Sequence, residues 1–151
     1  METILTLGIT AGFGIAGALA LAHSSTPKQV VRTDEAPLPI GPYSQAIKHG
    51  NLVFVSGQLG INKETKKLEA TVREQTAAAL THMKAILEAS GSGMDCVLKT
   101  TVFLADINDF PAMNEVYGTF FVREPPARST VQIARLPLGG LVEIEAVAHL
   151  K

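Results

Sequence analysis

An arginine and two glutamates near the C-terminus are the residues of this 151-residue chain best suited to anion binding and acid–base chemistry. Arg128 lies in the segment 126–135, and Glu143 and Glu145 lie in the segment 141–150. Successive side chains of a strand point to opposite faces, so the two glutamates share one face of the second segment. A guanidinium binds a planar carboxylate through two parallel hydrogen bonds, and a carboxylate can position and activate water. These residue types indicate a site for a small anionic substrate.

The spacing of the two segments predicts how they meet. The Leu-Pro-Leu-Gly-Gly sequence between them suits a turn, so we expect the segments to pair as a hairpin. One face of the hairpin would then carry Arg128, Thr130 and Gln132 together with Leu141 and Glu143. That face is too apolar for a solvated exterior, and another copy of the chain is expected to cover it.

Length and charge restrict the class of protein. A chain of 151 residues with a formal net charge of −1 predicts one main domain with no general attraction to nucleic acid. Cys96 is the single cysteine, which excludes an internal disulfide framework. The four histidines pair neither with it nor with each other, so no metal site is expected.

The first 29 residues form an apolar, glycine-rich leader and linker, and residues 30–151 form the main domain. Ile4–Ala22 contains no charged residue and ends in an Ala-Leu-Ala sequence like a cleavage site. However, Glu2 lies at its start and no lysine or arginine precedes Lys28, unlike a usual signal sequence. A removable or membrane-associated leader and an unusual appendage of a soluble protein both remain open.

Two helices are expected in the domain. Thr71 and Glu74 form a capping-box pattern that begins a helix, and Gly91 suits its end. Asn108 or Asp109 can cap a second helix that has a proline in its first turn. Strand-like runs precede, separate and follow the helices, in the order β-β-α-β-α-β-β. The predicted fold class is α+β, with a single mixed sheet and both helices packed on one face.

Four motifs in the same order resemble the RidA family, also called the YjgF/YER057c/UK114 family. They are IGPYSQA at 40–46, FVSGQLG at 54–60, KTTVFLADINDFPAMNEVYGTFF at 99–121, and PPARSTVQIARLP followed by VEIEAVA at 125–148. The resemblance covers about residue 31 to the C-terminus. It implies a chorismate-mutase-like subunit and a barrel-like homotrimer with clefts between subunits.

The resemblance also assigns site residues. It implies that Arg128 binds the substrate carboxylate and that Glu143 manages the attacking water, which leaves Glu145 for contacts between copies. The other matched substrate-binding positions are Tyr43, Ser56, Gly57, Asn114 and Thr130. Tyr43 is equally suited to a subunit interface. Many relatives have cysteine where this chain has Thr130, so the family contact is expected to use the backbone carbonyl.

The implied function is hydrolytic deamination of reactive enamines and imines, namely 2-iminobutanoate and 2-iminopropanoate, to 2-oxo acids and ammonia. Such an activity protects pyridoxal-phosphate enzymes, and it needs neither metal nor organic cofactor. The alternatives are an endoribonuclease or translation inhibitor and a non-catalytic, chaperone-like trimer. A cytoplasmic location is expected, with a mitochondrial one as the alternative. The leader keeps a secretory or membrane-associated location open.

Overall fold

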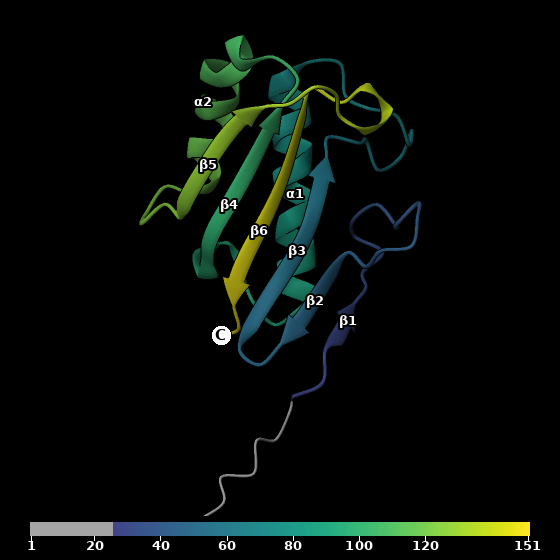
Figure 1. The fold of residues 1–151 in the computed structure, drawn as a ribbon, viewed down its shortest axis with the longest axis vertical. Coiled ribbons are helices and arrows are strands. Elements are labelled where there is room, and N and C mark those ends of the chain that lie inside the picture. The colour runs from purple at the N-terminus through teal and green to yellow at the C-terminus, as the bar shows by residue number, and fades with distance from the viewer. Residues whose placement is uncertain (1–25) are drawn as a thin grey trace, which may run out of the picture.

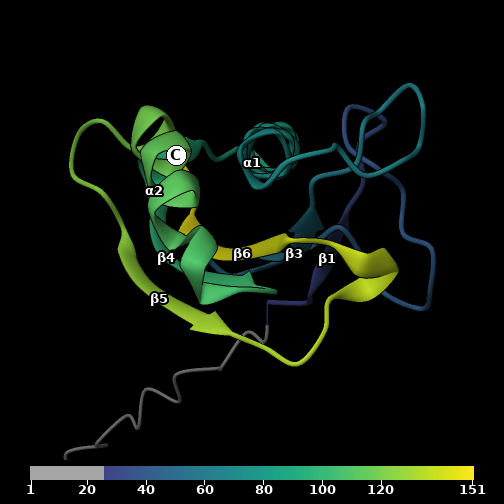
Figure 2. The same ribbon diagram turned by 90° about the horizontal axis from the view of Figure 1, so that it is seen from above.

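A six-stranded sheet carries two helices on one of its faces in the computed structural model, which describes residues 26–151. Figure 1 shows the sheet from its uncovered side, and Figure 2 shows both helices on the opposite side. The predicted α+β class is therefore confirmed. The leader expected before this domain lies almost entirely outside the described residues. No helix within residues 26–151 has the length and apolar character needed to cross a membrane.

The elements are short and regular. The strands are β1 (Gln29–Val31), β2 (Ala46–His49), β3 (Leu52–Leu59), β4 (Val97–Leu104), β5 (Ala127–Gln132) and β6 (Val142–His149). The helices are α1 (Val72–Ala89) and α2 (Phe110–Phe120), and 3-10 turns cover Met94–Cys96, Ile107–Asp109 and Pro137–Gly139. Strand β1 was not expected, and it begins at a residue that the sequence placed in the linker.

The strand order is β1-β2-β3-β6-β4-β5, and every neighbouring pair is antiparallel except the parallel pair β4–β5. The predicted hairpin is therefore wrong, because β5 and β6 are not neighbours. Strand β6 alternates buried apolar residues with more exposed ones and lies between β3 and β4, where both of its edges form ladders. In a hairpin at the end of the sheet, one of those edges would have had no partner.

Helix α1 follows the expected pattern at both ends. The Thr71 hydroxyl accepts from the Glu74 amide at 3.2 Å, and the Glu74 carboxylate accepts from the Thr71 amide at 3.0 Å. Ser90 is the C-cap, and Gly91 adopts φ 82°, a left-handed conformation that favours glycine. The buried side of the helix packs on the sheet and consists of Val72, Gln75, Thr76, Ala79, Leu80, His82, Met83, Ile86 and Leu87.

Helix α2 covers the edge of the sheet formed by β4 and β5. Asp109 is its N-cap and Pro111 lies in the first turn, as expected, although the Asp109 side chain makes no capping hydrogen bond. Met113 and Tyr117 are its buried residues. The crossover through α2 returns the chain parallel to β4, and this brings β5 beside the helix rather than beside β6.

The Gln45 side chain holds the loop before β2 in place. It is 2% exposed. Its amide oxygen accepts from the Thr33 amide at 2.8 Å, and its amide nitrogen donates to the Thr33 and Pro37 carbonyls, both at 3.0 Å. Because these groups are poorly hydrated in the fold, the side chain replaces water for them. Gln45 therefore contributes several of the hydrogen bonds that position the loop.

We expect Gln45→Ala to lower the free energy of unfolding by about 3 kcal/mol, because it leaves several partly buried backbone groups without partners. Urea denaturation followed by circular dichroism measures the change. The control is Gln29→Ala, which removes an exposed side chain of the same type from β1. Equal stability of the two variants would contradict this role of Gln45.

Candidate active site

Arg128 is held in a fixed orientation beside α2. Its register partner on β4 is Thr100, whose hydroxyl hydrogen-bonds with that of Tyr117 at 2.7 Å. Residues paired in register share a face, so Arg128 lies on the helix-covered side of the sheet. The arginine Nη2 donates to Asn114 Oδ1 at 2.7 Å, and its Cζ lies 4.4 Å from the centre of the Tyr117 ring.

This environment prepares the guanidinium to bind an anion. The ring of Tyr117 supports its plane through a cation–π contact, and a second ring, Phe110, lies 5.5 Å away. Among residues 26–151, Arg128 forms no salt bridge, so the rest of its fork has no acidic partner. Arg128, Asn114 and Tyr117 line a surface hollow of about 340 Å³. We call these three residues the arginine half-site.

Glu143 lies on the uncovered face, opposite a distortion in β3. Its register partners are Leu59 on β3 and Phe103 on β4, and the β3–β6 register shifts between Val55 and Gln58. The shift brings the Gly57 backbone against the Glu143 side chain. A Cβ atom on Gly57 would lie 1.9 Å from Glu143 Oε1, a distance that no real contact shows. Only glycine leaves room for the carboxylate in this position.

The pKa of Glu143 is raised above its ordinary value. Burial is the main cause, because a half-buried carboxylate loses hydration that stabilises its charge. The negative charge of Glu145, two residues further along the same face, adds to the effect. A carboxyl group with a raised pKa exchanges protons more readily near neutral pH than an ordinary glutamate does. We call Glu143, Gly57 and Tyr43 the glutamate half-site.

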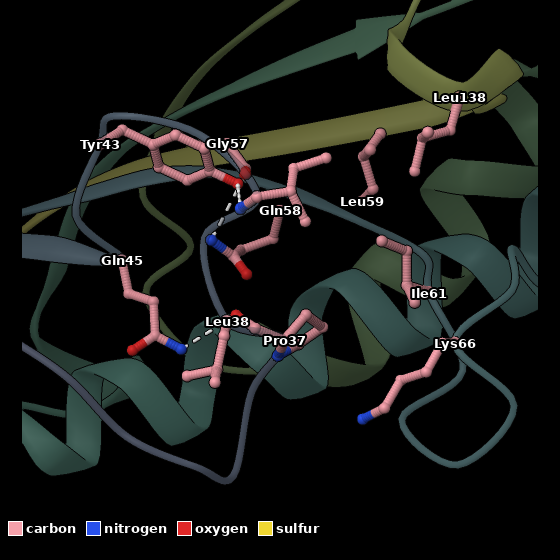
Figure 3. A pocket seen from close by; sticks show the side chains of 11 residues that line it. Pro37, Leu38, Tyr43, Gln45, Gly57, Gln58, Leu59, Ile61, Lys66 and Leu138 are labelled. Carbon is pink, nitrogen blue, oxygen red and sulfur yellow. Dashed lines mark hydrogen bonds between the residues drawn. The ribbon is translucent and has the colours of Figure 1, made fainter.

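Tyr43 and Ser56 complete the surroundings of Gly57. The Tyr43 side chain is largely exposed and its hydroxyl accepts from the Ile40 amide at 3.4 Å, while its ring lies beside Gly57 (Figure 3). The Ser56 hydroxyl donates to the Ser44 carbonyl at 2.7 Å, and this bond joins β3 to the loop that carries Tyr43. The hydroxyl proton of Ser56 is thus used within the fold, and the expected contact of Ser56 with substrate stays a prediction.

Thr130 lies two residues after Arg128 and on the same face, beside Val102 of β4. Its Oγ1 is buried and has no hydrogen-bond partner among the described residues. Because this hydroxyl makes no hydrogen bond among the described residues, a cysteine at this position would cost the fold no hydrogen bond. The expectation that this position acts through its backbone stays a prediction.

The two half-sites of one chain lie on opposite faces of the sheet. Their register partners on β4, Thr100 and Phe103, are three residues apart and so face opposite sides. Strand spacing and rise place the Cα atoms of Arg128 and Glu143 roughly 14 Å apart. The expectation that these residues share one face within a chain is therefore wrong, and it failed together with the hairpin from which it came.

Sequence reasoning missed the contribution of Tyr117 to the arginine half-site. Tyr117 was not among the candidate site residues, yet its ring supports Arg128 and its hydroxyl bonds to Thr100. The available signal was its spacing from Asn114, since residues three apart lie on the same side of a helix. Burial also raises the pKa of Tyr117, which keeps its hydroxyl protonated.

Comparison with known proteins identifies the family. Residues 33–150 match the family described as endoribonuclease L-PSP. The chain belongs to this family, the RidA/YjgF family. It is 50% identical over 133 residues to Reactive Intermediate Deaminase A, chloroplastic, of Arabidopsis thaliana, covering 87% of this chain and 71% of the plant protein. It is 47% identical over 127 residues to the 2-iminobutanoate/2-iminopropanoate deaminase of Dermatophagoides farinae, covering 83% and 99% of the two chains.

Solved structures share this fold as well. The structure of Escherichia coli TdcF with bound serine has a TM-score of 0.79 and 41% identity, and the match covers 82% of this chain and 99% of TdcF. A Thermotoga maritima protein described as a putative endoribonuclease has a TM-score of 0.78 and 47% identity, with 82% and 98% covered. The chain is thus a RidA-family protein related to reactive-intermediate deaminases.

We expect Glu143→Gln to raise the melting temperature at pH 8 by about 2 °C, a small change because solvent screens part of the effect. A pKa raised in the folded state means that the charged carboxylate destabilises the fold. The gain should be complete above the raised pKa and should vanish below the ordinary value of 4.5.

Differential scanning fluorimetry between pH 4 and pH 8 provides the measurement. The control is Glu64→Gln, which neutralises an exposed carboxylate in a loop. A gain for Glu143→Gln that does not depend on pH would show that desolvation of the charge is not its cause.

Proposed function

We propose that this protein hydrolyses 2-imino acids and their enamine tautomers to 2-oxo acids and ammonia. In this reaction water adds to the C=N carbon and the C–N bond then breaks, so that one imino acid and one water give one oxo acid and one ammonia. The observation that carries the proposal is the environment of Arg128. Its guanidinium is fixed by Asn114 and Tyr117 but has no acidic partner within residues 26–151, as a binding group for a substrate carboxylate requires.

Glu143 supplies the acid–base chemistry of the proposed reaction. The imine reacts in its protonated form, and the Glu143 carboxylate removes a proton from water as the oxygen attacks the imine carbon, which leaves a neutral amine and a hydroxyl on that carbon. The carboxyl group then gives this proton to the amine, the C–N bond breaks as ammonia leaves, and the hydroxyl proton passes to solvent as the C=O of the oxo acid forms. The raised pKa of Glu143 suits both steps, because the group must accept and donate within one cycle.

The proposed site forms between copies of the chain. Because Arg128 and Glu143 of one copy face opposite sides of its sheet, a small substrate can contact both only if they come from neighbouring copies. The uncovered face supports association, since it presents Leu52, Phe54 and Val131 to solvent, with Phe54 44% exposed. We propose the homotrimer implied by the family resemblance, with one cleft at each boundary between subunits.

A ribonuclease function has less support from the chain itself. The family description names an endoribonuclease, but the formal net charge of −1 offers no general attraction to a polyanion. Arg128 lies between aromatic rings beside α2, and we find no basic stripe around it in the hollow that it lines. The geometry favours one small carboxylate over a phosphate backbone.

Mixed assemblies test whether the two half-sites come from different copies. Arg128→Ala and Glu143→Gln should each reduce hydrolysis of 2-iminobutanoate to a small residual rate. When the two variants are refolded together in equal amounts, about one quarter of wild-type turnover should return, because one cleft in four receives both intact residues in a random ring. Ammonia release in a coupled assay with a threonine dehydratase provides the measurement.

Two controls accompany this experiment. Mixing the variants without refolding should restore nothing, provided that the subunits do not exchange. Arg128→Lys should recover little activity, since an ammonium lacks the planar fork. Absence of complementation in verified mixed assemblies would place both residues in one subunit's site, and full activity of Arg128→Ala would remove the proposed mechanism.

Gly57→Ala tests the position of the Glu143 carboxylate. The added Cβ meets the end of a flexible side chain, so the carboxylate should move while the backbone stays in place. We expect kcat/KM to fall about 100-fold, since a displacement near 1 Å has effects of this size. In steady-state kinetics, kcat/KM of the double variant Gly57→Ala/Glu143→Gln should be no lower than kcat/KM of Glu143→Gln alone. A further loss in the double variant would mean that Gly57 acts independently of Glu143.

A further inference from the structure

A cavity of about 360 Å³ adjoins the glutamate half-site and has no assigned role. Figure 3 shows it between the loop that carries Tyr43, the end of β3 and the turn that carries Leu138. We propose that this cavity receives the substrate's side chain, and that the preferred substrates are 2-imino acids with long apolar side chains. This inference rests on the proposed deaminase function and specifies its substrate class.

The cavity is continuous with the glutamate half-site. Tyr43 and Gly57 line it, and the same Gly57 backbone lies against the Glu143 carboxylate. An imine carbon placed beside Glu143 would therefore lie against the same Gly57 backbone that lines the cavity. A side chain attached to that carbon can extend past Gly57 into the cavity while the carboxylate points toward the neighbouring copy.

The wall of the cavity is mostly apolar. Its apolar lining residues are Pro37, Leu38, Ile40, Leu59, Ile61 and Leu138. The amide groups of Gln45 and Gln58 also face it, but Gln45 is fully engaged by the loop, and the Gln58 nitrogen donates to the Ser56 carbonyl at 2.9 Å. A hydrocarbon group would therefore displace water from this wall without leaving its amide nitrogens unpaired.

Two lining residues have backbone conformations that favour glycine. Lys66 has φ 61° and Leu138 has φ 58°, and both carry full side chains. Left-handed conformations are strained for residues with a side chain. Such strain is retained at positions where the side chain contributes to function. Leu138 is also 65% exposed, so burial within its own subunit does not explain it. Two of the three described non-glycine residues with positive φ thus line this cavity.

The size and charge of the cavity select among substrates. A methyl or ethyl group, as in 2-iminopropanoate or 2-iminobutanoate, would leave most of 360 Å³ unfilled. Lys66 is the single charged lining residue, and its ammonium is exposed. Its hydrocarbon stem can cover an apolar ligand while the charge stays in water. One exposed ammonium facing six apolar residues favours a hydrocarbon side chain over an acidic one.

The test compares imines that an amino-acid oxidase generates from alanine, leucine, phenylalanine and glutamate. For the full-length wild-type protein, we expect kcat/KM for the leucine- and phenylalanine-derived imines to exceed that for the alanine-derived imine about tenfold. Leu138→Gly should reduce this ratio about threefold. Folding is not at risk, because glycine adopts this backbone conformation without strain. Val30→Ala, at a site of similar exposure on β1, should keep the wild-type ratio.

The outcomes separate this inference from the proposed function. Equal kcat/KM for all apolar imines would overturn the inference. So would a ratio of kcat/KM between the leucine- and alanine-derived imines that Leu138→Gly does not change. A preference for the glutamate-derived imine that Lys66→Gly removes would also overturn it, in favour of an acidic side chain. If no imine is hydrolysed, the proposed function fails, and calorimetry then decides the inference. Binding of 4-methyl-2-oxopentanoate about tenfold tighter than pyruvate, weakened by Leu138→Gly, would support the cavity's role, and equal binding would overturn it.

Discussion

The insertion of β6 between β3 and β4 is the constraint on which the rest of the structure depends. Both edges of β6 form antiparallel ladders, and one of its faces is buried under the helices. That position fixes Glu143 on the uncovered face beside Gly57. It also excludes β5 from pairing with β6, so β5 joins the outer edge of β4 and Arg128 comes to lie beside α2. One choice of strand order thus separates the cation from the acid.

This separation gives each charged group a suitable environment. Within residues 26–151 of one chain, Glu143 forms no salt bridge, and burial together with the charge of Glu145 raises its pKa. Arg128 in turn is oriented by an amide and an aromatic ring, which hold its plane without neutralising its charge. In the proposed assembly, the two groups meet only where copies of the chain join, so association would complete the site as well as cover apolar surface.

In the proposed enzyme, the loop before β2 and the turn before β6 link the fold to the choice of substrate. The buried Gln45 amide fixes the first of these segments, and Leu138 adopts a left-handed conformation in the second. Both segments line the cavity next to Gly57. Neither belongs to the helices or to the sheet, and this allows their side chains to vary without disturbing the strand order that places Glu143.

Local patterns in the sequence determined the helices, the buried face of β6 and the fold class, because capping residues and side-chain alternation act within a few neighbouring residues. Ordered motifs likewise indicated the family and the candidate residues from Tyr43 to Glu143. The pairing of β5 with β4 was decided by tertiary structure alone, since strands distant in sequence compete for the same edges and local propensity does not rank the alternatives. The face of Arg128 follows from that pairing. The face of Glu143 and its contact with Gly57 follow from the place of β6 between β3 and β4 and from the register shift in β3, and the cavity beside Gly57 follows from the packing of the neighbouring loops.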